Sequence, residues 1–251
     1  MAAGPTVAVM TPLTSTARGT SPEGPLGGLA FLREAVHSFR TTGAIAPSSR
    51  HLAARLAAPL RPGGVRGPTR VLEVGAGTGP VTRELAGLLG PADRLDVVEI
   101  NPRFVDVLER GLRTDRVLAT AADRIRIIPK SITDVDLEPR YDVIVSCLPF
   151  TNFAPRQVGT ILDQYLAALV LGGTLTYFGY LGTQAARRLF DSRAEAARHR
   201  EVAAVLAEYA ERYGSGSSTV WANVPPARVW TLRAPATRIH PAVAAPVTET
   251  G

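Results

Sequence analysis

A short apolar strand that runs into three alternating glycines constrains this chain more than any other feature. Residues 70–74 read Arg-Val-Leu-Glu-Val, and Gly75, Gly77 and Gly79 lie at alternate positions directly after them. Glycine tolerates positive φ and has no Cβ, so the main chain can lie directly against a bound nucleotide. Glu99 follows twenty residues after Gly79, at the end of the next strand-like run. An acidic residue there is placed to accept hydrogen bonds from both hydroxyls of a ribose.

The spacing of the glycines distinguishes between two kinds of cofactor. A dinucleotide-binding turn has the pattern Gly-x-Gly-x-x-Gly, in which the third glycine allows close helix packing. In this chain Pro80 occupies that third position, and the third glycine comes one residue earlier. With Glu73, the segment reads Glu-x-Gly-x-Gly-x-Gly and resembles motif I of the class I S-adenosylmethionine-dependent methyltransferases. The alternative is a tight strand-to-helix turn that binds no ligand.

The resemblance to motif I implies S-adenosylmethionine as cofactor and a set of residues that hold it. The predicted cofactor-binding residues are Glu73, Gly75, Ala76, Gly77, Thr78, Gly79, Glu99, Ile100, Asn101, Ser131, Ile132, Ser146 and Leu148. Related enzymes usually carry Gly-Asp-Ala after the third strand, where the Asp contacts adenine, but here the segment is Lys130-Ser131-Ile132. We therefore expect Ser131 or the backbone to recognise adenine, with Asp134 as a substitute.

Composition excludes several classes of protein. The chain has 251 residues, enough for one α/β domain with a full core, and no apolar run reaches the roughly twenty residues that cross a bilayer. Residues 1–28 lack the basic and apolar stretches of a secretory signal. The single Cys147 allows no intrachain disulfide, and the four histidines have no metal-ligand spacing. We expect a cytoplasmic protein without a metal.

The net charge of +6 is concentrated in one part of the chain. Residues 28–70 contain seven arginines and one acid, Glu34, which gives a net of +6, so the rest of the chain sums to zero. Within this stretch, Phe31, Val36 and Phe39 fall on one face of a short amphipathic helix that also carries arginines. The helix either lies in a membrane interface or packs on the domain. An anionic partner fits the charge, and a solvated arginine-rich face is the plainer alternative.

Strand-like and helical runs alternate between two tails of low complexity. Strands are predicted at 70–74, 95–99, 125–128, 141–146 and 174–180, with helices after Pro80, after Pro102 and around 156–170, which indicates a mainly parallel sheet. Runs 218–223 and 227–232 are so close that they must pair antiparallel. The predicted organisation is a disordered tail (1–27), basic N-terminal helices (28–69), a methyltransferase domain (70–233) with a helical insertion (184–213), and a second disordered tail (234–251).

The segment after the predicted fourth strand bears on the methyl acceptor. It reads Ser146-Cys-Leu-Pro-Phe150-Thr-Asn-Phe153, and in this fold such a strand end faces the methyl group. Enzymes that methylate nucleobase amines carry Asn or Asp at the first position, whose side-chain oxygen accepts from the exocyclic amine. Ser146 stands there instead, so the group that holds a base is missing.

Four segments together resemble the bacterial phospholipid N-methyltransferases, which include phosphatidylethanolamine and ornithine lipid N-methyltransferases. They are Thr42–Ser49, Ser146–Phe150, Leu171–Tyr180 and Trp221–Trp230. The likeness covers about residues 29–233. It implies a Rossmann-like α/β fold with a seven-stranded, mostly parallel sheet that ends in an antiparallel hairpin. It also implies transfer of a methyl group to the amine of a membrane lipid.

The acceptor side of the reaction needs a neutral amine. A lipid amine with a pKa of about 10 is protonated at neutral pH, and removing its proton costs about 4 kcal/mol for roughly three pKa units. No carboxylate or histidine lies within 146–153, so no strong general base is predicted. The predicted catalytic residues are Tyr177 and Tyr180, which would hold the amine by hydroxyl and cation–π contacts, and Ser146.

Three functions are therefore compared. The first is a lipid N-methyltransferase that is cytoplasmic and associates peripherally with an anionic membrane through its basic N-terminal helix, without nucleic acid. The second is an rRNA adenine dimethyltransferase, which would need Asn at position 146 and a further basic helical domain. The third is a methyltransferase fold without activity that binds lipid.

Overall fold

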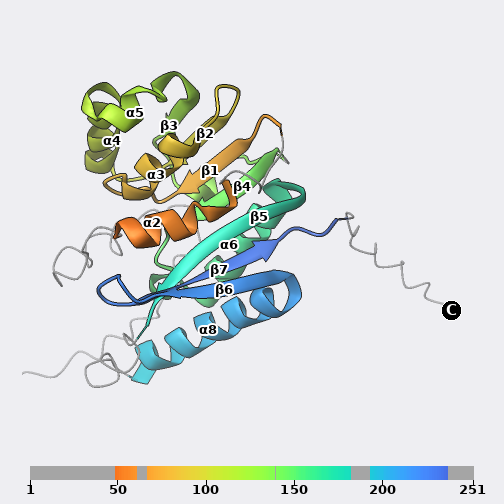
Figure 1. Ribbon diagram of the computed structural model, residues 1–251. Helices are drawn as coiled ribbons and strands as arrows, with labels where there is room; N and C mark the ends of the chain where they lie inside the picture. Colours follow the sequence, from red (N-terminus) through yellow and green to blue (C-terminus); the bar gives the residue numbers. More distant parts are fainter. Residues whose placement is uncertain (1–48, 61–66, 139, 182–192, 237–251) are drawn as a thin grey trace, which may run out of the picture.

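The protein is described by a computed structural model that covers residues 49–60, 67–138, 140–181 and 193–236. Within these residues, seven strands form one sheet in the order β3-β2-β1-β4-β5-β7-β6. All neighbouring pairs from β3 to β5 are parallel, whereas β7 is antiparallel to both β5 and β6. The predicted α/β, Rossmann-like methyltransferase sheet with an antiparallel C-terminal hairpin is therefore confirmed (Figure 1).

The strands are short and apolar in the centre of the sheet. β1 and β4 are almost fully buried, as expected for parallel strands with helices on both faces. The strand bounds are β1 Arg70–Val74, β2 Arg94–Val98, β3 Ile125–Ile128, β4 Tyr141–Ser146, β5 Leu169–Tyr180, β6 Gly214–Val220 and β7 Ala227–Arg233.

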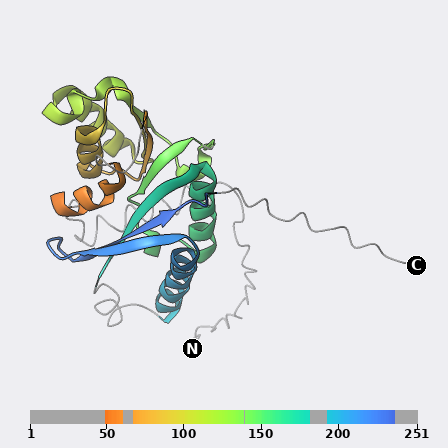
Figure 2. The ribbon, with the colours of Figure 1, turned by 45° about the vertical axis from the view of Figure 1, so that its right-hand side comes forward.

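Helices cover both faces of the sheet and enclose two apolar clusters (Figures 1 and 2). One face carries α2 (Arg50–Leu56), η1 (Ala58–Leu60), α3 (Pro80–Leu88), α4 (Pro102–Thr114) and α5 (Arg116–Ala119). The other carries α6 (Pro155–Ala168) and α8 (Arg193–Tyr213). Short 3-10 turns complete the connections: η2 (Ala122–Arg124), η3 (Ile132–Asp134) and η4 (Phe150–Asn152).

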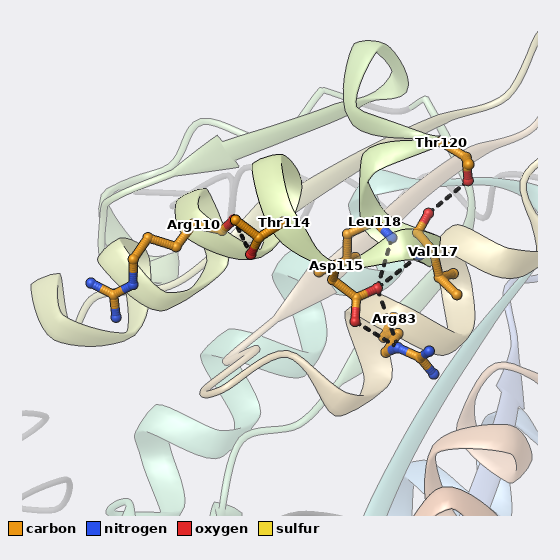
Figure 3. A network of polar contacts seen from close by, with 7 residues as sticks. All are labelled: Arg83, Arg110, Thr114, Asp115, Val117, Leu118 and Thr120. Carbon is orange, nitrogen blue, oxygen red and sulfur yellow. Dashed lines mark hydrogen bonds and ion pairs between the residues drawn. The ribbon is translucent and has the colours of Figure 1, made fainter.

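Local sequence signals place the ends of the helices. Asn101 caps α4 by accepting from the Arg103 N–H, and Pro102 occupies the first helical turn. Asp115 ends α4 and begins α5, where its carboxylate accepts from two backbone N–H groups and from Arg83 on α3 (Figure 3). The hydrogen bond from Leu118, with those from Val117 and Arg83, lowers the pKa of Asp115. The contact between Arg83 and Asp115 links α3 to the start of α5 on one face of the sheet.

Two predicted strands differ from the structure by several residues, whereas β2 and β7 differ by single residues at their ends. β5 begins at Leu169 rather than at 174, because Leu169 pairs with Tyr141 across an irregularity that precedes Val143. The strand predicted at 218–223 instead spans Gly214–Val220, because its glycines and serines pair with β7 as far as Leu232. Residues 221–223 consequently belong to the turn between β6 and β7 rather than to a strand.

The helix predicted at 184–213 is described from Arg193 onward and connects β5 to β6. Val202 is buried, and Val205, Leu206, Tyr209 and Tyr213 pack on the cluster that α6 also covers. The Tyr209 hydroxyl donates to the Gly159 carbonyl of α6. α8 therefore packs on the domain over the same face of the sheet as α6. The amphipathic helix predicted around residues 31–39 lies outside the described residues.

Candidate active site

The site lies where the direction of strand progression reverses between β1 and β4. β1 pairs with β2 on one side and with β4 on the other, and all three strands end at the same edge of the sheet. Loops that leave two such strands diverge, and the crevice between them is where open α/β sheets bind ligands. The glycine turn after β1 and the Ser146–Phe153 segment after β4 both start at this edge.

The glycine turn has the backbone that its sequence predicts. Gly75, Gly77 and Gly79 all have positive φ, at 77°, 59° and 87°. A Cβ on Gly77 would meet nothing within 4 Å, whereas one on Gly75 would come within 2.9 Å of the Leu148 side chain. No protein atom among the described residues therefore covers the turn at Gly77, whereas at Gly75 the turn packs closely against the loop after β4. Such a surface lets a ligand approach the peptide plane of Gly77.

Glu99 connects the glycine turn to the end of β2. Its two carboxylate oxygens accept from the N–H groups of Gly77 and Asn101, each at 2.8 Å. Burial raises the pKa of Glu99, and these backbone hydrogen bonds oppose that shift. Each carboxylate oxygen has a further lone pair, so the group can hold the turn and still accept from ribose hydroxyls.

Glu73 is the most unusual charged group at this edge. It is 0% exposed, and neither carboxyl oxygen has a hydrogen-bond partner among the described residues. Burial raises its pKa to about 8, interaction with Thr82 opposes this rise, and the charge of nearby Glu99 adds to it. A buried carboxyl without partners is costly to keep and gains most from a cationic or donor ligand. The ammonium group of S-adenosylmethionine is such a ligand.

The remaining predicted cofactor residues follow strands that end at the same edge. Ser131 and Ile132, after β3, are buried, and the Ser131 hydroxyl caps η3 and contacts Thr133. Asp134, the predicted substitute in adenine recognition, is exposed. Ala76 is buried, Thr78 is exposed, and Ile100 and Asn101 are half-buried. Their roles in binding remain predictions.

Ser146 is held in a fully buried position. Its hydroxyl lies 3.3 Å from the hydroxyl of Tyr165 on α6, and both residues are 0% exposed. Desolvation raises the pKa of Tyr165, so its hydroxyl stays protonated over the physiological range. Tyr165 could not be recognised as a site residue from the sequence, because it belongs to an ordinary apolar helical stripe with Val158, Ile161 and Leu162. Leu148, two residues further on, is buried over Gly75.

The two predicted catalytic tyrosines lie on opposite faces of the sheet. Tyr177 packs with the α6 cluster, and Tyr180 packs against the cluster under α2 and α3. Tyr177 stacks on Trp230 at 5.4 Å between ring centroids and meets Phe150 edge-on at 5.7 Å. Its buried hydroxyl has no hydrogen-bond partner in the described part of the chain, and desolvation raises its pKa. The structure therefore does not bring the two tyrosines together as a pair.

The site contains one cysteine, Cys147, whose surroundings bear on its reactivity. Cys147 is half-buried, and desolvation, with the charges of Glu73 and Glu99, raises the pKa of its thiol. A thiol in such surroundings is a poor nucleophile. The described residues contain no group of three or more His, Cys, Asp or Glu side chains that could hold a metal. No helix in the described stretches is both long and apolar enough to span a bilayer.

Comparison with known proteins agrees with this geometry. Residues 71–173 match a family model described as a methyltransferase domain. The fold resembles the crystal structure of 1,6-didemethyltoxoflavin-N1-methyltransferase from Burkholderia thailandensis, which contains bound S-adenosylhomocysteine. The TM-score is 0.56 at 20% identity, and the match covers 89% of this chain and 98% of the other. At that identity the likeness concerns the fold alone.

Two curated proteins share part of the sequence. A mitochondrial ribosomal RNA small subunit methyltransferase from Arabidopsis thaliana is 30% identical over 96 residues, which are 38% of this chain and 23% of that protein. An ornithine lipid N-methyltransferase from Singulisphaera acidiphila is 27% identical over 124 residues, 48% of this chain and 64% of that protein. The matches thus span less than two thirds of the length of either relative.

The residues at the carboxyl edge fit S-adenosylmethionine, and the toxoflavin methyltransferase of similar fold contains bound S-adenosylhomocysteine. Gly77 leaves the turn bare, the Glu99 carboxylate retains acceptor capacity, and the buried Glu73 carboxyl lacks a partner. A methyl donor with a ribose and an ammonium group satisfies all three features. Residues 71–173 thus match a methyltransferase domain, and S-adenosylmethionine is the cofactor that the residues of this edge fit.

Proposed function

We propose that this protein transfers a methyl group from S-adenosylmethionine to the amine of a membrane lipid, of the phosphatidylethanolamine or ornithine lipid class. The observation that carries the proposal is the burial of Ser146 and the contact of its hydroxyl with Tyr165. This residue occupies the position where base-methylating enzymes need an amide or carboxylate, and its hydroxyl is already paired with Tyr165 in a fully buried setting. The partial similarity to an ornithine lipid N-methyltransferase supports the same substrate class.

The surroundings of the β4 loop suit an amine that must lose its proton. Phe150, Phe153 and Tyr177 are buried there, and Trp230 stacks on Tyr177. An apolar setting of this kind disfavours the charged form of an amine and lowers its pKa. The cofactor supplies an electrophilic methyl group, so direct displacement by the neutral amine requires no covalent enzyme intermediate. The protein contributes desolvation and orientation of the acceptor.

Tyr177 is the residue we assign to holding the acceptor amine. Because its hydroxyl is buried without a partner among the described residues, its hydrogen-bonding capacity is free for a ligand. Its raised pKa keeps the hydroxyl protonated, so Tyr177 accepts a hydrogen bond from the amine and does not act as a base. Tyr180, which lies on the other face of the sheet, is assigned no shared role with it.

Methylation of ribosomal RNA is the second candidate function. The similarity to a ribosomal RNA methyltransferase over 96 residues favours it. Against it stands Ser146, because a base amine would meet a hydroxyl that is already engaged, rather than an amide oxygen. Binding to RNA would also depend steeply on salt concentration.

A methyl-transfer assay on two substrate sets tests the choice. The full chain is incubated with isotopically labelled S-adenosylmethionine and either lipid extract containing phosphatidylethanolamine and ornithine lipid, or ribosomal RNA. We expect label in the lipid fraction, with methylated head groups identified by mass spectrometry. Label in RNA alone would replace the lipid proposal by the second candidate. A Gly77→Ala variant, in which a Cβ would enter the bare side of the turn, is the control for cofactor-dependent transfer.

We also propose that the protein works at the cytoplasmic membrane surface as a peripheral protein. The supporting observation is the net charge of +6 carried by residues 28–70. Anionic lipids attract basic segments by about 1 kcal/mol per arginine near the surface. Flotation with anionic vesicles tests this proposal, and vesicle binding that survives removal of residues 28–41 would separate that segment from membrane association.

A further inference from the structure

The turn between β6 and β7 presents apolar side chains to solvent. Trp221 is 74% exposed and Val224 is 80% exposed, and only one other large apolar side chain, Leu171 at 55%, is so exposed among the described residues. Leaving a tryptophan in water forgoes the large apolar burial that this side chain offers. These two side chains lie three positions apart on one turn and form a small apolar surface, and we name the turn (residues 221–226) the hairpin tip.

The hairpin tip is held in place by polar contacts rather than by packing of its own apolar side chains. Asn223, which is 3% exposed, donates to the Pro225 carbonyl at 2.8 Å and accepts from the Ser49 N–H at 3.0 Å. The Pro226 carbonyl accepts from the Leu181 N–H at 2.7 Å. Because the buried amide fixes the backbone, Trp221 and Val224 on either side of it are directed outward. The exposed side chains are therefore features of a supported turn.

The hairpin tip lies at the same edge of the sheet as the active site. β7 is antiparallel to β5, and Tyr180 at the carboxyl end of β5 pairs with Ala227 at the start of β7. The hairpin tip therefore lies at the edge of the sheet where β1 and β4 end and where the glycine turn and the Ser146 loop begin (Figure 1). Leu171, in contrast, lies near the amino end of β5 at the opposite edge.

Positive charge surrounds the hairpin tip. α2 lies beside the β6–β7 hairpin in both views (Figures 1 and 2), and Arg55 donates to the Ser218 hydroxyl. Arg50 directly follows Ser49, whose N–H donates to Asn223 in the hairpin tip. Arg228, the second residue of β7, is exposed as well. The described residues 49–60 and 214–236 contain no Asp or Glu. An apolar point with a basic collar matches the profile of a bilayer interface with anionic head groups.

We propose that the hairpin tip inserts into the interface of an anionic lipid bilayer and brings the carboxyl edge of the sheet onto the membrane surface. Trp221 and Val224 enter the boundary between head groups and acyl chains, while Arg50, Arg55 and Arg228 contact lipid phosphates. This inference deepens the lipid N-methyltransferase proposal and rests on it for its biological purpose. It differs from the basic segment 28–41, because it assigns the contact to a folded turn next to the active site.

Vesicle binding by the full chain tests the insertion directly. Vesicles of phosphatidylcholine, with and without phosphatidylglycerol, are mixed with the wild type and with a Trp221→Ser/Val224→Ser double variant, and binding is measured by flotation. We expect the double variant to lose at least about tenfold in partitioning to the anionic vesicles. Leu171→Ser, which removes an exposed apolar side chain at the opposite edge, is the matched control and should bind like the wild type. Equal binding of the wild type and the double variant would overturn the proposal.

Fluorescence reports the depth of the contact. The chain has two tryptophans, so Trp230→Phe leaves Trp221 as the sole tryptophan reporter. Its emission should shift to the blue on addition of anionic vesicles and should be quenched by lipids brominated on the acyl chains. An unchanged spectrum with bound vesicles would contradict insertion. A shift caused by RNA or by a protein fraction, and not by vesicles, would assign the tip to a different partner and also overturn the proposal.

The arginines are tested in the same format. Arg50→Gln/Arg228→Gln should weaken binding to anionic vesicles and reduce its dependence on salt, whereas Arg110→Gln/Arg113→Gln on α4 should leave both unchanged. Equal losses in the two variants would mean that the net charge of the protein, and not the collar, determines binding.

Activity separates failure of this inference from failure of the proposed function. If both hold, the Trp221→Ser/Val224→Ser variant methylates lipid dispersed in detergent as fast as the wild type, but methylates lipid in vesicles more slowly. If the wild type binds vesicles through the tip and methylates no lipid, the proposed function fails and the insertion stands. If the double variant methylates vesicle lipid at the wild-type rate, the insertion fails and the function stands.

Discussion

The two halves of the sheet handle buried polar groups in different ways. The cofactor half (residues 70–134) buries two carboxyls, Glu73 and Glu99, beside the hydroxyls of Thr82 and Ser131, and Glu99 is satisfied by backbone N–H groups. The buried polar groups of the acceptor half (residues 141–233) are uncharged, such as the hydroxyls of Ser146 and Tyr165, which contact each other across helix and strand. Stability and ligand binding in the cofactor half should therefore depend on pH and on the charge of the ligand. In the acceptor half they should depend on how well the side chains and the ligand pack together.

The largest expected difference between the halves is in the pH dependence of stability. Burial raises the pKa of Glu73 from 4.5 to about 8, so between these values the folded state keeps a proton that the unfolded state releases. The free energy of unfolding therefore falls as pH rises through this window, and the contribution of the neutral carboxyl is complete below it. The loss is about 5 kcal/mol for a shift of this size.

Replacement of Glu73 by Gln should remove most of this slope, as measured by denaturant unfolding at pH values on either side of the window. Tyr165→Phe in the acceptor half should lower stability by a similar amount at every pH and leave the slope in place. If Glu73→Gln kept the wild-type slope, the assignment of the titration to this residue would be wrong.

Cofactor affinity should depend on the bare side of the glycine turn. Gly77→Ala places a Cβ where the structure has nothing within 4 Å, so the strain is that of alanine at a φ of 59°, about 1 kcal/mol. We expect the fold to persist while affinity for S-adenosylhomocysteine, measured by calorimetry, falls by about 100-fold through loss of close backbone approach. Wild-type affinity in the folded variant would show that the cofactor does not lie against Gly77.

Loss of the Glu99 carboxylate should also lower cofactor affinity, but by less than Gly77→Ala. In Glu99→Gln one of the two N–H groups, of Gly77 or Asn101, faces an amide NH2 instead of an acceptor, which costs about 1–3 kcal/mol. Cofactor affinity should fall about tenfold or more, because the turn and the ribose acceptor are both affected. Asp96→Asn, in the middle of the strand that precedes Glu99, is the matched control. Asp96 pairs with Arg126 on β3, so its loss should lower stability without changing cofactor affinity.

The smallest expected change in stability is in the acceptor half. Tyr177→Phe removes a hydroxyl that makes no hydrogen bond within the described residues, so the free energy of unfolding should change by less than about 1 kcal/mol or rise slightly. If Tyr177 holds the amine, kcat on lipid should fall while cofactor affinity stays constant. A decrease in stability together with unchanged kcat would instead assign the hydroxyl a structural partner.

The same contrast explains which features could be predicted from the sequence. Positive φ at Gly75, Gly77 and Gly79 is a local backbone requirement, so the glycine turn was predictable, and the predicted mainly parallel sheet is also confirmed. The early start of β5 was not, because Gly172 and Gly173 suggest a turn, and only pairing with β4 extends the strand.

The contacts between side chains in the acceptor half could not be predicted from the sequence pattern. Contact between Ser146 and Tyr165 depends on how α6 is rotated on the sheet, which no local motif encodes. The separation of Tyr177 and Tyr180 follows from the alternation of side chains along a strand, since positions three apart face opposite sides. That rule was available from the sequence, and it excludes a shared role for the two rings on one face.

One hydrogen bond has a consequence for shortened versions of the chain. Ser49 caps α2 with its side chain by accepting from Leu52, while its own N–H donates to Asn223 in the hairpin tip. A truncation that starts after this residue removes the helix cap and an anchor of a turn 174 positions away at the same time. Cutting just before Ser49 or just after it should therefore yield two proteins that differ in the rigidity of the active-site edge, although they differ by a single residue.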